Sequence, residues 1–154
     1  MTTQDFLTDT MGSVELNDAP INPSWILEGQ PRARSRTIAQ SGDGGSSSAE
    51  WECTAGAFRW YFAVDETVHI VEGKVTVTGA NGVSRTLRAG DVAFFPQGTW
   101  MVWEVDVYVR KLAFLRQQVP GWLMPLVRVR NRLTNFVRFR LPAPRAPVRV
   151  VAAE

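Results

Sequence analysis

Short β-rich runs separated by turn residues dominate the middle of this chain, and they constrain its fold more than any other feature. Between Trp51 and Leu115 these runs follow one another at regular spacing, and Gly, Asn and Pro residues interrupt them. No helical period occurs here, whereas Lys74–Thr78 alternates apolar and polar residues as a half-buried strand does. The Asn-Gly pair in Ala80–Gly82 predicts a type I′ hairpin turn. Many short strands with turns between them indicate an all-β sandwich or barrel.

Composition narrows the classes of protein further. The 154 residues fit one domain, and 45% hydrophobic and 21% charged residues are typical of a globular protein. One cysteine (Cys53) and one histidine (His69) exclude an internal disulfide and a zinc site of Cys and His ligands within the chain. A catalytic pair of Cys53 and His69, or a serine triad that uses His69, has no supporting local signature. A lone Cys is more often a buried apolar residue.

The N-terminal part of the sequence lacks the marks of a targeting segment. Residues 1–18 carry four acidic side chains and no Lys or Arg, unlike a secretory signal. No apolar run approaches the about 20 residues that a membrane-spanning helix needs. The sequence therefore predicts a cytoplasmic protein. Three arginines at alternating positions either line one side of a strand or face water, and water is favoured: Arg32, Arg34 and Arg36.

The stretch from Glu66 to Met101 resembles the two signature motifs of the cupin superfamily. Glu66-Thr-Val-His-Ile-Val-Glu-Gly73 is similar to the Glu-to-Gly half of the first motif, and Gly90 to Met101 follows the second in all but its last position. The wider sequence resembles the small single-domain cupins grouped with (S)-ureidoglycine aminohydrolase. The resemblance implies a double-stranded β-helix, a jelly-roll-like barrel, that forms a homodimer. The predicted parts are an N-terminal arm (1–24), the cupin barrel (25–116) and a basic C-terminal extension (117–154).

The departures from the cupin motifs concern the metal ligands. The two His positions of the first motif fall on Trp60 and Phe62, and the His of the second falls on Met101. The ligand set of ureidoglycine aminohydrolase falls on the same positions and is missing too, so Glu66 alone is retained. One carboxylate and a thioether do not make a site for Mn, Fe or Zn. We therefore predict that the usual cupin metal is absent and that the protein uses no cofactor.

The predicted site is the lining of the barrel. Strand alternation puts Trp60 and Phe62 on one face, and Met101 and Trp103 on one face, which the resemblance places inside. The candidate ligand-binding residues are Trp60, Phe62, Glu66, Met101, Trp103 and Lys111. Either the aromatic rings simply fill a small barrel, or they form an apolar slot around one carboxylate. In the second case Glu66 is the candidate catalytic residue or an anchor for an amine or hydroxyl. Burial would raise its pKa, and pairing with Lys111 or Arg59 would lower it.

Two functions follow from this site. The first is a metal-independent cupin that binds a small-molecule ligand. The alternative is an enzyme similar to (S)-ureidoglycine aminohydrolase, which releases ammonia from a small nitrogenous substrate. The missing metal ligands favour the first function, and whether the chain is an enzyme stays open. In a third interpretation the barrel is filled and only the C-terminal extension acts, through a partner.

The C-terminal extension differs from the barrel in charge and in period. Residues 1–111 hold 14 acidic and 9 basic side chains, whereas residues 112–154 hold 1 and 8. Apolar residues recur at spacings of three and four from Leu123 to Val137, which predicts a basic amphipathic helix, although parts of the segment also alternate with period two.

Three partners for the helix remain open: the barrel or a second copy, an anionic membrane surface bound by residues 122–140, and nucleic acid. Nucleic acid is the least favoured because no binding motif accompanies the charge. Membrane binding would make the cytoplasmic protein peripheral to a membrane.

Overall fold

The computed structural model of this protein describes residues 8–138, with side chains for residues 8–132. Residues 1–7 of the predicted arm and residues 139–154 of the predicted extension lie outside the described residues. The chain divides into two units, residues 1–118 and residues 119–154.

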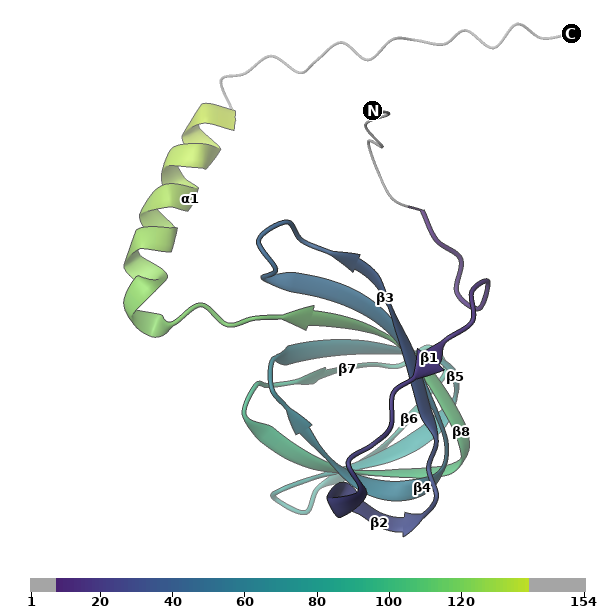
Figure 1. Ribbon diagram of the computed structural model, residues 1–154. Helices are drawn as coiled ribbons and strands as arrows, with labels where there is room; N and C mark the ends of the chain where they lie inside the picture. Colours follow the sequence, from purple (N-terminus) through teal and green to yellow (C-terminus); the bar gives the residue numbers. More distant parts are fainter. Residues whose placement is uncertain (1–7, 139–154) are drawn as a thin grey trace, which may run out of the picture. The chain divides into compact units, whose positions relative to one another are not determined.

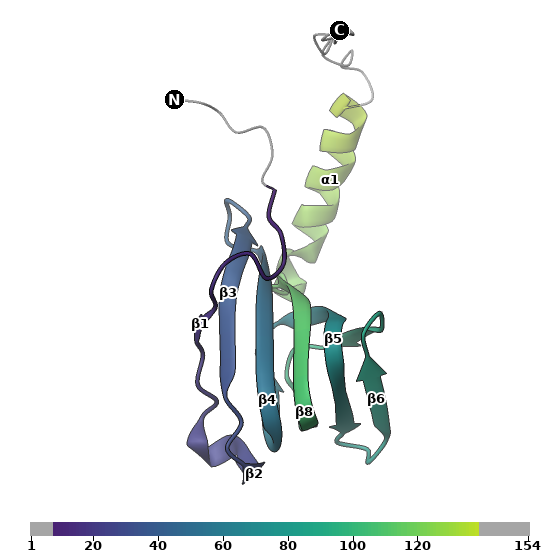
Figure 2. The same ribbon diagram turned by 90° about the vertical axis from the view of Figure 1, so that its right-hand side faces the viewer.

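The first unit is built from antiparallel strands that curl around an interior (Figure 1). In chain order the strands are β1 (Asn17–Asp18), β2 (Ile26–Gly29), β3 (Ala33–Gln40), β4 (Ser46–Phe62), β5 (Asp65–Gly79), β6 (Ser84–Arg88), β7 (Val92–Phe95) and β8 (Thr99–Arg116). The sheet order is β1-β3-β4-β8-β5-β6, with β2 paired to β4 and β7 paired to β5. Figure 2 shows β3, β4, β8, β5 and β6 side by side. The prediction of an all-β barrel is confirmed.

Long, bent strands replace several of the short predicted runs. β4 pairs with β8 from Ser46 opposite Arg116 to Phe62 opposite Thr99, and β5 pairs with the other edge of β8. Register shifts interrupt these ladders without ending the strands. The apparent breaks in the sequence are therefore bulges that bend a strand, as barrel closure requires.

A register shift between β4 and β8 decides which side chains of β4 enter the core. The register shifts between Thr54 and Gly56. Trp51 and Cys53 are buried before the bulge, and Phe58 and Phe62 are buried after it, so the inward positions change from odd to even numbers. A strict period-two count back from Phe62 puts Trp51 on the outer face, and the register shift, where Ala55 of β4 faces Asp106 and Val107 of β8, reverses this.

The connection between β5 and β6 corrects the predicted turn. A type I′ turn needs positive φ at both central residues, and no residue other than Gly has positive φ in the described part of the chain. Asn81 therefore does not occupy such a position, whereas Gly82 has a φ of +75°. The amide of Gly79 donates to the carbonyl of Val83 at 3.0 Å, which closes a loop of three residues. The Asn-Gly pair therefore predicts the position of the hairpin correctly, but the predicted turn type is wrong.

A glycine at a register shift of β5 lets two strands approach closely. Gly73 has a φ of +73°, and a Cβ placed there would overlap the backbone carbonyl of Tyr108 in β8. We expect Gly73→Ala to lower the free energy of unfolding by about 2–3 kcal/mol, because it combines a strained φ with a clash against backbone. Urea denaturation followed by far-UV circular dichroism measures this loss.

Gly82→Ala is the matched control for this prediction. Gly82 has a φ of +75°, but a Cβ there would meet no atom within 4 Å. The control carries the conformational cost of positive φ, about 1 kcal/mol, without the clash. Equal losses in the two variants would show that the close approach of Gly73 to β8 does not matter.

An ion-pair network on the outer face ties the N-terminal residues to the sheet. The Glu50 carboxylate is fully buried and pairs with Arg36 at 2.8 Å and with Arg110. The amide of Gly12 donates to the same carboxylate at 3.2 Å, and Arg36 also pairs with Asp9 at 2.5 Å. The prediction that Arg36 faces water is therefore wrong, because its position in β3 lies directly opposite Glu50 in β4.

The second unit contains a helix, as its apolar spacing predicts. A 3-10 turn, η2 (Gly121–Leu123), leads into α1 (Met124–Arg138). Pro125 stands in the first turn, where a missing backbone N–H costs no hydrogen bond. The period-two alternative is wrong for residues 127–130. Among the described residues, no helix is both long and apolar enough to cross a membrane.

Candidate functional site

The six predicted site residues come from three strands and lie in or against the barrel core. β4 carries Trp60 and Phe62, β5 carries Glu66, and β8 carries the other three. Four of the side chains are buried: Phe62, Glu66, Trp103 and Lys111. Trp60 and Met101 are partly buried, pack against the same core and face each other across β4 and β8. The predicted inward faces are therefore found in the structure.

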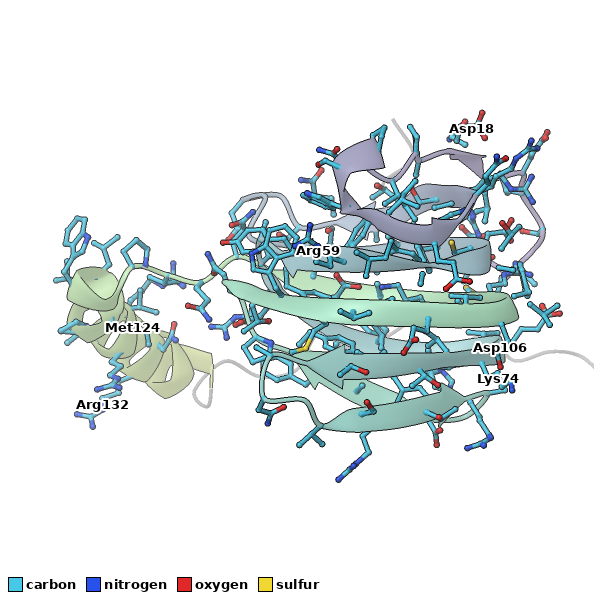
Figure 3. The ribbon with its side chains drawn as sticks, turned by 90° about the horizontal axis from the view of Figure 1, so that it is seen from below. Asp18, Arg59, Lys74, Asp106, Met124 and Arg132 are labelled. Atoms are coloured by element: carbon cyan, nitrogen blue, oxygen red, sulfur yellow. The ribbon has the colours of Figure 1, made fainter. Side chains whose placement is uncertain are left out.

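A buried ion pair joins Lys111 to Glu66 inside the barrel. Lys111 Nζ donates to Glu66 Oε1 at 2.6 Å, and the two residues are only 4% and 6% exposed. Lys111 reaches the carboxylate diagonally, because Glu66 stands opposite Leu115, four positions further along β8. Arg59, the other partner considered, is exposed to solvent (Figure 3). The structure therefore selects Lys111 as the cation beside Glu66.

Two tryptophan rings enclose the Lys111 ammonium. Lys111 Nζ lies 4.9 Å from the ring centre of Trp51 and 4.6 Å from that of Trp103. Such contacts stabilise a cation through the negative face of the ring, and more so when water is excluded. The sequence does not predict Trp51 in the site, because only the register shift between β4 and β8 turns it inward. No pattern in the sequence alone signals this.

Hydrogen-bonding capacity remains unused around this ion pair. The indole N–H of Trp103 is buried and has no hydrogen-bond partner within the described residues. Lys111 is the single hydrogen-bond donor to Glu66 among the side chains and amides of the described part, and it uses one carboxylate oxygen. A buried donor without a partner is costly, and native structures usually satisfy it with protein, water or a ligand. The site therefore retains one donor and one acceptor that a bound molecule could use.

Aromatic rings fill most of the space around the pair. Phe62 stacks on Phe95 with ring centres 4.5 Å apart, and Trp103 stacks on Phe58 at 6.4 Å. Trp25 of the 3-10 turn η1 (Pro23–Trp25) contacts the edge of Trp60 at 5.9 Å. The interior is thus closely packed, and a ligand could enter only if side chains moved. Trp60 and Met101, being partly exposed, stand where that interior meets solvent.

An open groove lies elsewhere, outside the predicted site. It has a volume of about 670 Å³ and is lined by residues at the ends of β3, β4, β5 and β8, together with Phe94 of β7. None of the six predicted residues lines it. Neither Lys111 nor Glu66 is among the residues that line the groove.

The hypothesis of a Cys53–His69 catalytic pair is wrong. Cys53 is fully buried in the core, and burial raises the pKa of its thiol to about 12. His69 alternates in β5 with the buried Val68 and Ile70, so its side chain lies on the other face of the sheet. A thiol held protonated and apart from a base cannot act as a nucleophile.

The comparison with family models identifies the barrel. Residues 40–113 match the family described as EutQ-like cupin domain. No curated protein matches the chain. The match covers β4 to most of β8 and includes all six predicted site residues.

Solved structures support the same fold. A DUF861-family protein of unknown function from Pseudomonas syringae pv. tomato has 26% identity and a TM-score of 0.61, over 67% of this chain and 45% of that chain. The EutQ protein of Clostridium difficile has 15% identity and a TM-score of 0.52, over 64% of this chain and 81% of that chain. A protein assigned as ethanolamine utilization protein Q from Salmonella typhimurium has 23% identity and a TM-score of 0.50, over 55% and 69%.

The residues at the cupin metal positions do not fit a metal ion. Trp60 and Phe62 offer no ligand atom, Met101 offers a thioether, and the Glu66 carboxylate is already paired with an ammonium. Within residues 8–132, no three His, Cys, Asp or Glu side chains lie close enough together to hold a metal. The positive charge next to Glu66 is instead part of the protein.

Proposed function

Because residues 40–113 match the EutQ-like cupin domain, we propose that this barrel binds a small molecule without a metal, at the Lys111–Glu66 pair. The observation that carries the proposal is the combination of a buried ion pair with an unpartnered Trp103 N–H and a second, unused carboxylate oxygen. A barrel that serves only as a scaffold gains more from apolar residues, since a buried ion pair costs desolvation on both sides.

The charge balance of the pair indicates the class of ligand. The Lys111 ammonium and the Glu66 carboxylate neutralise each other, so a charged ligand would introduce an uncompensated charge into an apolar interior. A neutral molecule with a carbonyl or hydroxyl group avoids this cost. Its oxygen would accept from Trp103, and its hydroxyl or amide N–H would donate to Glu66. The surrounding rings would cover its apolar part.

Tryptophan fluorescence tests the proposal with three probes: allantoin as a neutral ureide, glucose as a sugar, and methylamine as a cationic amine. We expect saturable quenching by a neutral probe and none by methylammonium. Trp103→Phe keeps the ring and removes the N–H, and should weaken binding roughly tenfold through one lost hydrogen bond. Glu66→Gln should abolish it.

The control for both variants is the near-UV circular dichroism spectrum, which must stay native for the loss to concern binding. Quenching that is unchanged in Trp103→Phe and Glu66→Gln would contradict the site, as would the absence of saturable quenching by every probe. Release of ammonia from ureidoglycine by the purified protein would instead support the enzyme hypothesis.

A further inference from the structure

We propose that the segment from η2 into α1 binds the surface of an anionic lipid bilayer, with the helix lying in the plane of the interface. This inference is independent of the barrel and of its ligand. The sequence places the membrane-binding segment at residues 122–140, of which the structure describes side chains up to residue 132. The argument therefore uses residues 122–132 alone.

Large apolar side chains of this segment are exposed to water. Trp122 is 77% exposed, Leu126 65% and Val129 57%. Leu126 and Val129 are three positions apart in α1 and so are neighbours on its surface, and Trp122 precedes Leu126 by four. A 15-residue helix is marginally stable alone in water and needs to bury an apolar face. The exposed apolar side chains of this segment therefore favour contact with an apolar partner.

The polar side chains of the segment are cationic. Arg128, Arg130 and Arg132 are exposed, and the sequence contains no Asp or Glu between residues 112 and 153. On a helix, positions 128 and 132 lie about 60° or more away from the Leu126–Val129 stripe, and position 130 lies at its edge, about 40° from Leu126, so the charges flank the apolar surface. A basic face beside an apolar face that begins with a Trp is the pattern of helices that lie in a membrane interface.

The pairing of these two surfaces selects a lipid over a nucleic acid. Nucleic acid would neutralise the arginines but leave Trp122, Leu126 and Val129 in water. An anionic bilayer takes up both, because headgroups attract the arginines and the acyl boundary accepts the apolar side chains. Each Arg near such a surface contributes about 1 kcal/mol. No acidic side chain of the segment opposes this attraction.

Co-sedimentation of the full-length chain with vesicles tests the proposal. We expect binding to vesicles of equal parts phosphatidylserine and phosphatidylcholine, weakening as salt is added, and little binding to pure phosphatidylcholine. The triple variant Arg128→Gln/Arg130→Gln/Arg132→Gln should bind about 100-fold more weakly, the equivalent of about 1 kcal/mol for each charge. Leu126→Ser should weaken binding about tenfold or more through lost apolar burial.

Matched controls come from exposed residues of the barrel. Arg32→Gln/Arg85→Gln/Arg88→Gln removes the same charge from the first unit, and Leu27→Ser removes a similarly exposed leucine. Both controls should bind like the wild type. The proposal is overturned if the full-length chain stays in the supernatant, if the control triple weakens binding as much as the helix triple, or if duplex DNA binds tightly while vesicles do not.

Discussion

Replacing Lys111 with Met is expected to lower the free energy of unfolding by about 3–5 kcal/mol, a large part of the stability of a domain of this size. Met fills a volume similar to that of the lysine stem but leaves the Glu66 carboxylate buried without its cation. An uncompensated buried charge is strongly destabilising. The two rings that enclose the ammonium, Trp51 and Trp103, also lose their contact with a cation.

Lys74→Met provides the matched control, since Lys74 is the one other lysine in the chain. It pairs with Asp106 at 2.6 Å, but both side chains are more than half exposed, and Figure 3 shows the two residues side by side at one end of the strands. Removing an exposed pair should cost less than about 1 kcal/mol. Urea denaturation at pH 7 measures both variants. Equal losses for Lys111→Met and Lys74→Met would contradict a buried ion pair.

A double variant separates the ion pair from simple packing. Lys111→Met combined with Glu66→Leu removes both charges and keeps an apolar interior. Its stability should lie well above that of Lys111→Met and near that of the wild type, since a buried ion pair is often replaceable by apolar residues of similar volume. A double variant that is less stable than Lys111→Met would indicate lost packing rather than lost charge.

Glu50→Gln is the second substitution with a large expected effect, about 3–5 kcal/mol of unfolding free energy at pH 7. The carboxylate is fully buried and holds Arg36 and Arg110 together, and it accepts from the amide of Gly12. The neutral amide leaves two arginines without their shared anion and weakens the attachment of the N-terminal residues. Glu72→Gln, at an exposed partner 4.0 Å from Arg110, is the control and should cost less than about 1 kcal/mol.

The Glu50 network also predicts a dependence on pH. Burial tends to raise the pKa of Glu50, but hydrogen bonds from Arg110 and Arg36 outweigh burial and hold the pKa below its usual 4.5. Because the native pKa is lower than the unfolded one, this stabilisation is complete above about pH 4.5 and disappears as the pH falls through the native value. The stability difference between wild type and Glu50→Gln should therefore shrink on acidification below that pH. A difference that stays constant down to pH 3 would contradict this role.

Much of the barrel could be predicted from the sequence, and the limits of that prediction have a physical cause. Alternation and turn residues identify where β-structure begins and which face of β4 and β8 carries Trp60, Phe62, Met101 and Trp103. Alternation does not reveal where a register shift occurs. A shift by one residue moves every side chain beyond it to the other face of the sheet. Trp51 enters the site for that reason alone.

Pairing between distant residues was the second limit. Lys111 and Arg59 are equally available partners for Glu66 in the sequence, and the choice depends on the register of β5 against β8. The same holds for Arg36 and Glu50, which meet through the register of β3 against β4. Register is set by the whole sheet and not by local pattern. The predicted homodimer is a matter of contacts between chains, and it stays a prediction.

Lysine side-chain NMR tests the central claim, a buried ammonium of the protein where cupins place a metal. The chain has two lysines, so ¹⁵N-lysine labelling gives at most two side-chain signals. Exposed ammonium protons exchange quickly with water, whereas a buried, hydrogen-bonded group is protected. We predict one protected ammonium signal at pH 7 that persists in Lys74→Met, disappears in Lys111→Met and moves in Glu66→Gln. Rapid exchange at both lysines, or a protected signal that Glu66→Gln leaves unmoved, would contradict the account.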